Sequence, residues 1–152
     1  MEPNEPNEPN KPINIIFLDF DGVIHSVNEK HTNEFNRISY IEHIVKNTNA
    51  KIVISSDWRF VYTLDAIKKH LLPSLMDYII DETPFININI SRETEISLFL
   101  KETSHNIKNY VIIDDIKVCE KESSMFSNFV RTNGHIGITE DDVNKIMRIL
   151  QG

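Results

Sequence analysis

Asp19 and Asp21 stand one residue apart where an apolar run ends, in the stretch IIFLDFDGVIH, and Gly22 follows them directly. Side chains two positions apart on an extended segment point the same way, so both carboxylates can face one cleft. Gly22 permits the sharp exit that the chain needs after such a pair. The plain structural alternative is that both acids only form a turn at a strand end.

Two further apolar runs, KIVIS over 51–55 and NYVIID over 109–114, also end in polar residues. The polar residues at or just after these ends are Ser55, Ser56, Asp114 and Asp115. Converging carboxylates repel one another unless a cation or a proton joins them, and Mg²⁺ prefers such oxygen ligands. The sequence therefore predicts an acidic metal site, while helix capping is the alternative interpretation of these serines and of Asp114 and Asp115.

The elements that must position these residues can be read from the spacing of apolar side chains. A continuous apolar run starts at Ile13, and weaker strand patterns lie near Tyr78 and Phe129. Spacings of three and four predict helices over 39–47, 57–72, 91–103 and 139–150, with Ser91 and Thr139 as N-caps. Alternating strands and helices predict an α/β fold with a mostly parallel five-stranded sheet, whose ligands bind at the carboxyl ends of the strands.

Length and composition set the domain organisation. The chain has 152 residues, 40% of them hydrophobic and 26% charged, which is ordinary for one globular domain. Residues 2–10 repeat EPN three times, so we expect a disordered tail over 1–12 and a single folded domain over 13–152.

Charge and cysteine content exclude some classes of protein. The formal net charge is −7, from 23 acidic and 16 basic residues, so we expect no extensive non-specific binding to nucleic acid and no membrane partner. Cys119 is the single cysteine, which excludes an intramolecular disulfide and a cysteine-based zinc cluster. We expect Cys119 to be a buried thiol without a catalytic role. No run resembles a membrane span or a signal peptide, which favours a cytoplasmic location.

Three motifs in this order carry a resemblance to a known superfamily. FLDFDGV resembles the first motif of the haloacid dehalogenase (HAD) superfamily, IVISS is similar to its second motif, and YVIIDD resembles its fourth. The resemblance spans roughly Ile13 to Leu150. It implies a three-layer Rossmann-like HAD fold, and the short spacers between the motifs leave no room for a substantial cap domain.

The resemblance also implies catalytic roles for the first pair. Asp19 matches the nucleophile, which attacks phosphorus to form an aspartyl-phosphate intermediate and also binds the metal. Asp21 matches the general acid/base, and its backbone carbonyl matches a metal ligand. Asp21 argues for hydrolysis, because superfamily pumps that must keep their phosphoenzyme lack an acid at this position.

The other motif residues match the phosphate and metal sites. Ser55 matches the residue that hydrogen-bonds the transferring phosphoryl group, and the adjacent Ser56 is the alternative. Asp115 matches the usual acidic ligand of Mg²⁺, with Asp114 beside it as a ligand or a supporting residue.

A cation near the phosphoryl oxygens is also expected. Arg92, at the start of the helix before the fourth motif, is the predicted residue, and Lys101 and Lys108 are the fallback candidates. Lysine is commoner at this position in the superfamily. Arg59 directly follows the second motif and is a second predicted phosphate-binding residue, although a buried ion pair is an equal interpretation.

SSDWR resembles a small capless branch of the superfamily that carries Ser-x-Trp-Arg after the second strand. Asp57 departs from that branch, where a small neutral residue is more usual. Trp58 is interpreted as a core residue or a lid over the cleft. His25 lies in the segment that forms a mobile flap in superfamily members.

These features together predict a magnesium-dependent phosphomonoester hydrolase. An open cleft suits a large or exposed phosphate ester, such as a phosphoprotein or a nucleic-acid end, although a small phosphate ester such as a nucleotide or sugar phosphate is also compatible. One alternative is a nucleic-acid end-processing phosphatase or nucleotidase. Another, from a different class, is a non-catalytic phosphate- or protein-binding module that keeps the fold.

Overall fold

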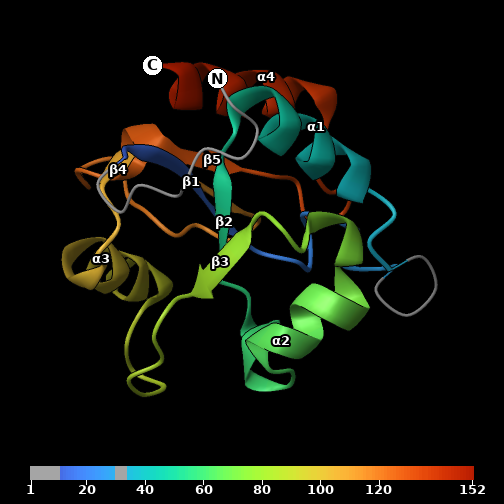
Figure 1. The fold of residues 1–152 in the computed structure, drawn as a ribbon, viewed down its shortest axis with the longest axis horizontal. Coiled ribbons are helices and arrows are strands. Elements are labelled where there is room, and N and C mark those ends of the chain that lie inside the picture. The colour runs from blue at the N-terminus through green and yellow to red at the C-terminus, as the bar shows by residue number, and fades with distance from the viewer. Residues whose placement is uncertain (1–10, 30–33) are drawn as a thin grey trace.

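The computed structural model describes residues 11–29 and 34–152, so the predicted tail over 1–12 lies almost wholly outside the described residues. The sheet is formed by β1 (Ile13–Leu18), β2 (Lys51–Ile54), β3 (Ile79–Glu82), β4 (Ile107–Asp114) and β5 (Phe129–Arg131). The helices are α1 (Ile38–Thr48), α2 (Leu64–Ala66), α3 (Arg92–Glu102) and α4 (Glu140–Gln151). Figure 1 shows their arrangement.

The five strands form one sheet in the order β3-β2-β1-β4-β5, and every neighbouring pair is parallel. Phe17 on the central strand aligns with Val53 on one side and with Ile112 on the other. On one side of the central strand β1 lie β2 and then β3, and on the other side lie β4 and then β5. The topological switch point therefore lies between β1 and β4, where ligands bind in sheets of this kind.

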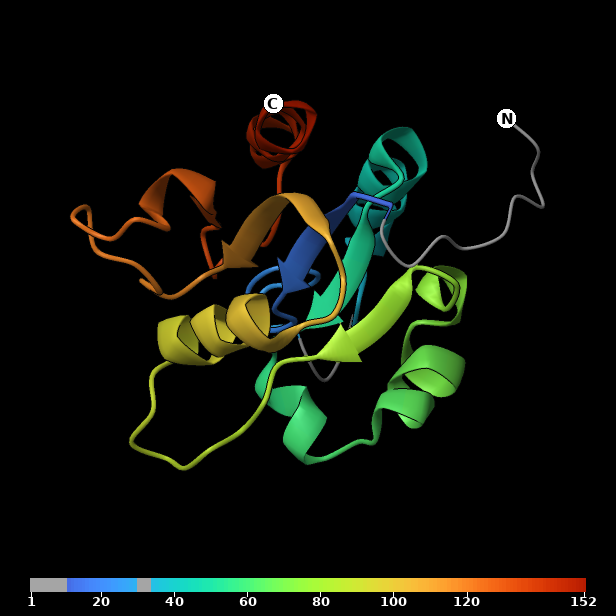
Figure 2. The same ribbon diagram turned by 60° about the vertical axis from the view of Figure 1, so that its left-hand side comes forward.

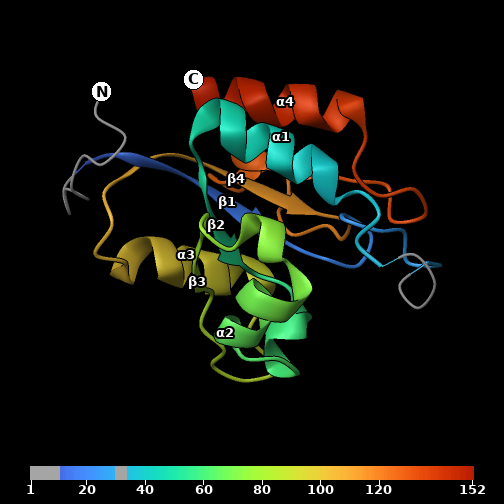
Figure 3. The ribbon, with the colours of Figure 1, turned by 45° about the vertical axis from the view of Figure 1, so that its right-hand side comes forward.

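The two faces of the sheet bury different side chains of the same strands. Ile16 and Leu18 pack with α1 and α4, whereas Ile15 and Phe17 pack with residues of α3. Figures 2 and 3 show α1 and α4 side by side over one face and α3 on the other. This three-layer arrangement confirms the predicted α/β fold.

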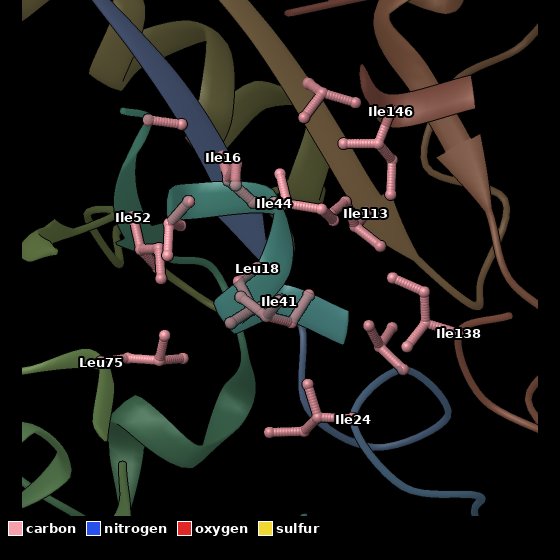
Figure 4. Packing of buried hydrophobic residues seen from close by; sticks show 14 of the residues in the cluster. Ile16, Leu18, Ile24, Ile41, Ile44, Ile52, Leu75, Ile113, Ile138 and Ile146 are labelled. Atoms are coloured by element: carbon pink, nitrogen blue, oxygen red, sulfur yellow. The ribbon is translucent and has the colours of Figure 1, made fainter. Parts of the chain in front are cut away.

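The larger core lies under α1 and α4 (Figure 4). Ile41 and Ile44 of α1 and Ile146 of α4 reach it, and all three are fully buried. The predicted N-cap of α4 is present as a capping box, in which Thr139 and Asp142 each bond the other's backbone. This cap starts the helix at the residue that the sequence indicates.

The helix predicted over 57–72 is wrong, because the segment contains three short pieces. A 3₁₀ helix covers Asp57–Phe60, α2 begins at Leu64, and a π-helical turn covers Ile67–Leu71. The Thr63 hydroxyl accepts a hydrogen bond from the backbone N–H of Ala66, at 3.1 Å. Thr63 is therefore a second N-cap, which starts a new helix within the predicted one.

The connections between strands in the described ranges contain no additional domain, which confirms the prediction of no substantial cap. Within the same ranges, no helix has the length and apolar character that crossing a bilayer requires. The N-terminus of α3 lies near the carboxyl ends of β1 and β4, where its Arg92 approaches Asp19 and Asp114.

Candidate active site

Three carboxylates converge at the switch point between β1 and β4. Asp19 follows β1 directly, Asp114 is the last residue of β4, and Asp115 comes next. One oxygen from each of them lies within 4.8 Å of the others. Asp19 and Asp114 are buried, and Asp115 is partly exposed. The structure thus brings together three of the four acids that the motifs indicate.

Two glycines make room for the Asp115 carboxylate. A Cβ on Gly22 would lie 2.3 Å from Asp115 Oδ2, and a Cβ on Gly134 would lie 2.7 Å from the same oxygen. Gly22 also has a φ of +82°, a conformation that other residues rarely adopt. The buried Thr132 hydroxyl donates to the Gly22 carbonyl at 2.7 Å and fixes this loop against the residues after β5. No other side chain could occupy position 22 without moving Asp115.

Arg92 supplies the positive charge at this cluster. Its Nη1 lies 2.7 Å from Asp114 Oδ2 and 3.5 Å from Asp19 Oδ1, while its Nη2 donates to Asp57 Oδ1 at 2.8 Å. Arg92 is the first residue of α3, and the Ser91 hydroxyl caps that helix. The predicted cation therefore lies beside the predicted nucleophile. The fallback residues Lys101 and Lys108 are exposed, in the last turn of α3 and near the amino end of β4.

Burial and crowding change the acidity of these groups. Burial, followed by the charge of Asp114, raises the pKa of Asp19 well above its ordinary value, although Arg92 lowers it in part. Burial and Asp114 also raise the pKa of Asp115. Burial alone would lower the pKa of Arg92, but Asp114 and Asp19 outweigh it and raise that pKa further. The cluster holds more negative charge than one arginine neutralises.

The two predicted serines differ in their surroundings. The Ser56 hydroxyl accepts a hydrogen bond from the Trp58 backbone N–H at 3.2 Å and caps the 3₁₀ helix. Ser55 Oγ is buried and has no hydrogen-bond partner within the described part of the chain. A buried hydroxyl without a partner is costly in an otherwise satisfied fold. Ser55, directly after β2, is therefore the serine whose hydroxyl is available for a ligand.

Within the described residues, the guanidinium of Arg59 forms no ion pair with Asp19, Asp114 or Asp115. Its Nη2 donates to Glu95 Oε1 at 2.9 Å, and its other nitrogens donate to the backbone carbonyls of Ser55, Ser56 and Thr83. Only 1% of the Arg59 side chain is exposed. Its donors are thus occupied within the protein, and the prediction that Arg59 binds phosphate is replaced by the alternative of a buried ion pair.

The Asp21 side chain lies apart from the three-acid group. His25 Nε2 is 2.7 Å from Asp21 Oδ1, and Trp58 Nε1 donates to the same oxygen at 3.1 Å. Its side chain is 38% exposed, so part of it is accessible to solvent. The sequence indicated neither contact: Trp58 lies 37 residues from Asp21, and His25, four residues from Asp21, lies in a turn whose shape the spacing does not determine.

Cys119 is buried in the hydrophobic cluster on the α3 face of the sheet. Burial, and then the nearby charge of Glu93, raises the pKa of the Cys119 thiol to about 11. The thiol is therefore protonated at neutral pH, which leaves it a poor nucleophile.

The donor set fits a hard divalent cation. All three groups are carboxylates, which magnesium and calcium prefer, and no softer ligand lies among them. The three oxygens lie within 4.8 Å of one another, near enough for one ion to contact all three. Asp19, Asp114 and Asp115 are therefore the residues that could hold a metal.

An all-parallel sheet with acids at its switch point, and a cation on the helix that precedes β4, defines an α/β protein of the HAD type. Comparison with protein-family models identifies the family itself. Residues 15–143 match the model described as the HAD domain in Swiss Army Knife RNA repair proteins, and the chain belongs to this family. At the level of the superfamily, this supports a phosphatase-type hydrolase, and HAD proteins typically use a metal ion. Comparisons with curated proteins and with solved structures gave no match.

Proposed function

We propose that this chain is a magnesium-dependent phosphomonoester hydrolase that acts through an aspartyl-phosphate on Asp19. One observation carries the proposal: Asp19 lies within a single cluster with Asp114, Asp115 and the Arg92 guanidinium, at the switch point of the sheet. A nucleophile, metal-binding acids and a cation for the phosphoryl oxygens are the parts that phosphoryl transfer requires. The family match supports the same reaction class.

In the first step, an oxygen of the Asp19 carboxylate forms a bond to phosphorus while the ester O–P bond breaks. The departing alkoxide oxygen takes a proton from the carboxyl group of Asp21. In the second step, water attacks the phosphorus of the aspartyl-phosphate and gives its proton to Asp21. The bond between Asp19 and phosphorus breaks, and inorganic phosphate leaves.

Two other groups orient the transferring phosphoryl. The free Ser55 hydroxyl is available to donate to one of its oxygens. Arg92 binds a second oxygen and holds Asp114 in place. A magnesium ion held by Asp19, Asp114 and Asp115, with the predicted Asp21 backbone carbonyl, would neutralise charge on the acids and the phosphoryl group.

The test is a hydrolysis screen over aryl, nucleotide, sugar and peptide phosphate esters, with magnesium or with EDTA. We expect wild-type turnover that requires magnesium, and a loss of about 10³-fold or more in kcat for Asp19→Asn, because the amide cannot form the covalent intermediate. Asp65→Asn is the matched control, since Asp65 is an exposed acid whose ion pair in the described part of the chain is with Lys69. Equal rates for wild type and Asp19→Asn would refute the mechanism.

The family description favours a second, narrower candidate, a phosphatase that acts on RNA ends. The absence of a cap domain in the described ranges agrees with a substrate too large to be enclosed. Oligoribonucleotides with a 3′- or 5′-phosphate should then be hydrolysed with a higher kcat/KM than the matching mononucleotides. A decline of kcat/KM with rising salt would indicate contacts to the RNA backbone. Equal kcat/KM for both lengths would favour a small ester instead.

A further inference from the structure

Asp21 is held by two donors that share one of its oxygens. His25 Nε2 and Trp58 Nε1 lie 2.7 Å and 3.1 Å from Oδ1, and no other hydrogen bond to this side chain occurs within residues 11–29 and 34–152. The two oxygens of the carboxyl group are therefore not equivalent. Oδ1 is occupied by these two donors, whereas Oδ2 has no hydrogen-bond partner in those ranges, and the side chain is 38% exposed.

The hydrogen bonds also define the tautomer of His25. The Phe35 backbone N–H lies 3.2 Å from His25 Nδ1, and a backbone N–H can only donate, so Nδ1 accepts. The hydrogen of the neutral ring is then on Nε2, where it donates to Asp21. Phe35 makes this contact with a φ of 59°, which is unusual for a bulky residue. Such a backbone conformation persists only where surrounding contacts fix it.

The contacts that fix Phe35 come from three rings, those of His25, Trp58 and Phe20. Phe35 stacks on His25 with centroids 5.4 Å apart, and its ring lies 5.2 Å from Trp58 and 5.7 Å from Phe20. The His25 ring lies 6.0 Å from that of Trp58 and is fully buried. Both donors to Asp21 are thus held in a packed aromatic cluster and cannot easily turn away.

We propose that His25 and Trp58 are positioning residues that fix the Asp21 carboxyl group so that Oδ2 carries the transferred proton. The inference rests on the proposed function, because it names the residues that hold Asp21, the acid/base of that reaction. Neither ring touches the reacting atoms. Both act by holding Asp21 Oδ1, which sets where Oδ2 meets the leaving oxygen.

The kinetic test compares two esters that differ in their need for a proton. The 4-nitrophenolate group leaves without one, whereas a simple alkyl alcohol must be protonated as it departs. The variants are Trp58→Phe, which keeps a ring and removes the N–H, His25→Leu, and His25→Gln, which restores a donor near Nε2. Tyr62→Phe is the matched control, because Tyr62 stacks on Trp58 without bonding Asp21.

The measured quantity is kcat/KM, which reports the steps up to phosphoryl transfer. For Trp58→Phe and His25→Leu we expect the ratio of alkyl to aryl ester to fall by about tenfold, a fraction of what a general acid contributes. His25→Gln should recover part of this loss, and Tyr62→Phe should show no change in the ratio. If the ratio is unchanged in Trp58→Phe, whether kcat/KM stays the same or falls equally for both esters, the positioning role is overturned.

A second measurement needs no activity and separates this inference from the proposed function. Trp58 is the only tryptophan, so its indole N–H gives one resonance in a ¹⁵N spectrum. Replacement of Asp21 by Ala should shift that resonance upfield, and the His25 nitrogens should show the Nε2–H tautomer in the wild type. If the protein hydrolyses no ester but both signatures appear, the proposed function fails and the hydrogen bonds stand. An unshifted indole or an Nδ1–H tautomer overturns the inference whatever the activity.

Discussion

The carboxyl group of Asp19 couples the chemistry of the site to the stability of the fold. Its pKa is raised in the folded protein, first by burial and then by Asp114. A raised pKa means that the protonated form is favoured by folding. This contribution to stability is present below the unfolded pKa, about 3.9, and is lost as the pH rises through the higher folded pKa.

Asp19→Asn should therefore stabilise the metal-free protein at neutral pH. In EDTA we expect the Tm of the variant to exceed that of wild type by a few degrees at pH 7, with the difference shrinking as the pH falls to about 4. Thermal melts over this pH range measure it. Asp65→Asn, which removes an exposed charge, should show no such pH-dependent difference in Tm. A Tm difference between Asp19→Asn and wild type that is constant at all pH values would contradict a raised pKa of Asp19.

Replacement of Gly22 should affect both the stability of the fold and the affinity for magnesium. Gly22→Ala places a Cβ against Asp115 and forces an L-residue to a φ of +82°, so we expect a loss of at least about 1–2 kcal/mol in unfolding free energy. Magnesium affinity, measured by calorimetry, should also fall because Asp115 must move. Gly134→Ala meets the same carboxylate without positive-φ strain, and should weaken magnesium binding with a smaller loss of stability.

The sequence predicted the residues of the acidic cluster but not the partners of every cation. Asp19, Asp114 and Asp115 meet because β1 and β4 are neighbours in the parallel sheet, and Arg92 joins them from the first turn of α3. Arg59 could not be assigned, since its partner Glu95 lies on α3 and only the packing of α3 on the sheet brings them together. The Trp58 donor to Asp21 was not predicted because it depends on how the segments after β1 and β2 meet, and the His25 donor depends on the shape of the turn that follows Asp21.

At the scale of elements, Arg59 joins three separate parts of the fold. Its guanidinium bonds carbonyls after β2, a carbonyl after β3 and the Glu95 carboxylate on α3. The loops that carry Ser55 and Asp57 are thus attached to the helix that carries Arg92. A buried ion pair of this kind fixes geometry even where its net contribution to stability is small.

Arg59→Leu should cost about 3–5 kcal/mol of unfolding free energy, because Glu95 then stays buried without its partner. Urea denaturation measures the loss. In the double variant Arg59→Leu with Glu95→Leu, part of the stability should return. The control Lys69→Ala breaks the exposed pair with Asp65 and should cost less than about 1 kcal/mol. A loss for Arg59→Leu no larger than for Lys69→Ala would contradict the structural role.

The elements themselves were predictable to different degrees. The apolar runs of β1, β2 and β4 and the caps at Ser91 and Thr139 placed five elements close to their observed positions. The error over 57–72 arose because apolar spacing continues across a break. Thr63 caps the second piece, but a threonine within a helical pattern is not by itself a signal for a new helix start.

For the whole molecule, metal binding should appear as a gain in stability. A ligand that binds only the folded state adds about 2.7 kcal/mol at a concentration 100 times its Kd. We therefore expect magnesium to raise the Tm of wild type by several degrees, as measured by differential scanning calorimetry, and to do so far less in Asp115→Asn. Sodium chloride at equal ionic strength is the control, and an equal rise in wild type and variant would exclude Asp115 as a ligand.

The central place of β1 in the sheet has a consequence for how the protein folds. β1 pairs with β4, and Thr132, which lies 110 residues after Gly22, closes the loop behind Asp115. Contacts this distant in sequence slow folding, because the loop-closure entropy is lost before the contacts form. A ribosome-bound chain that ends before β4 lacks Asp114 and Asp115 altogether. The three-acid cluster therefore assembles late, only after β4 has been synthesised.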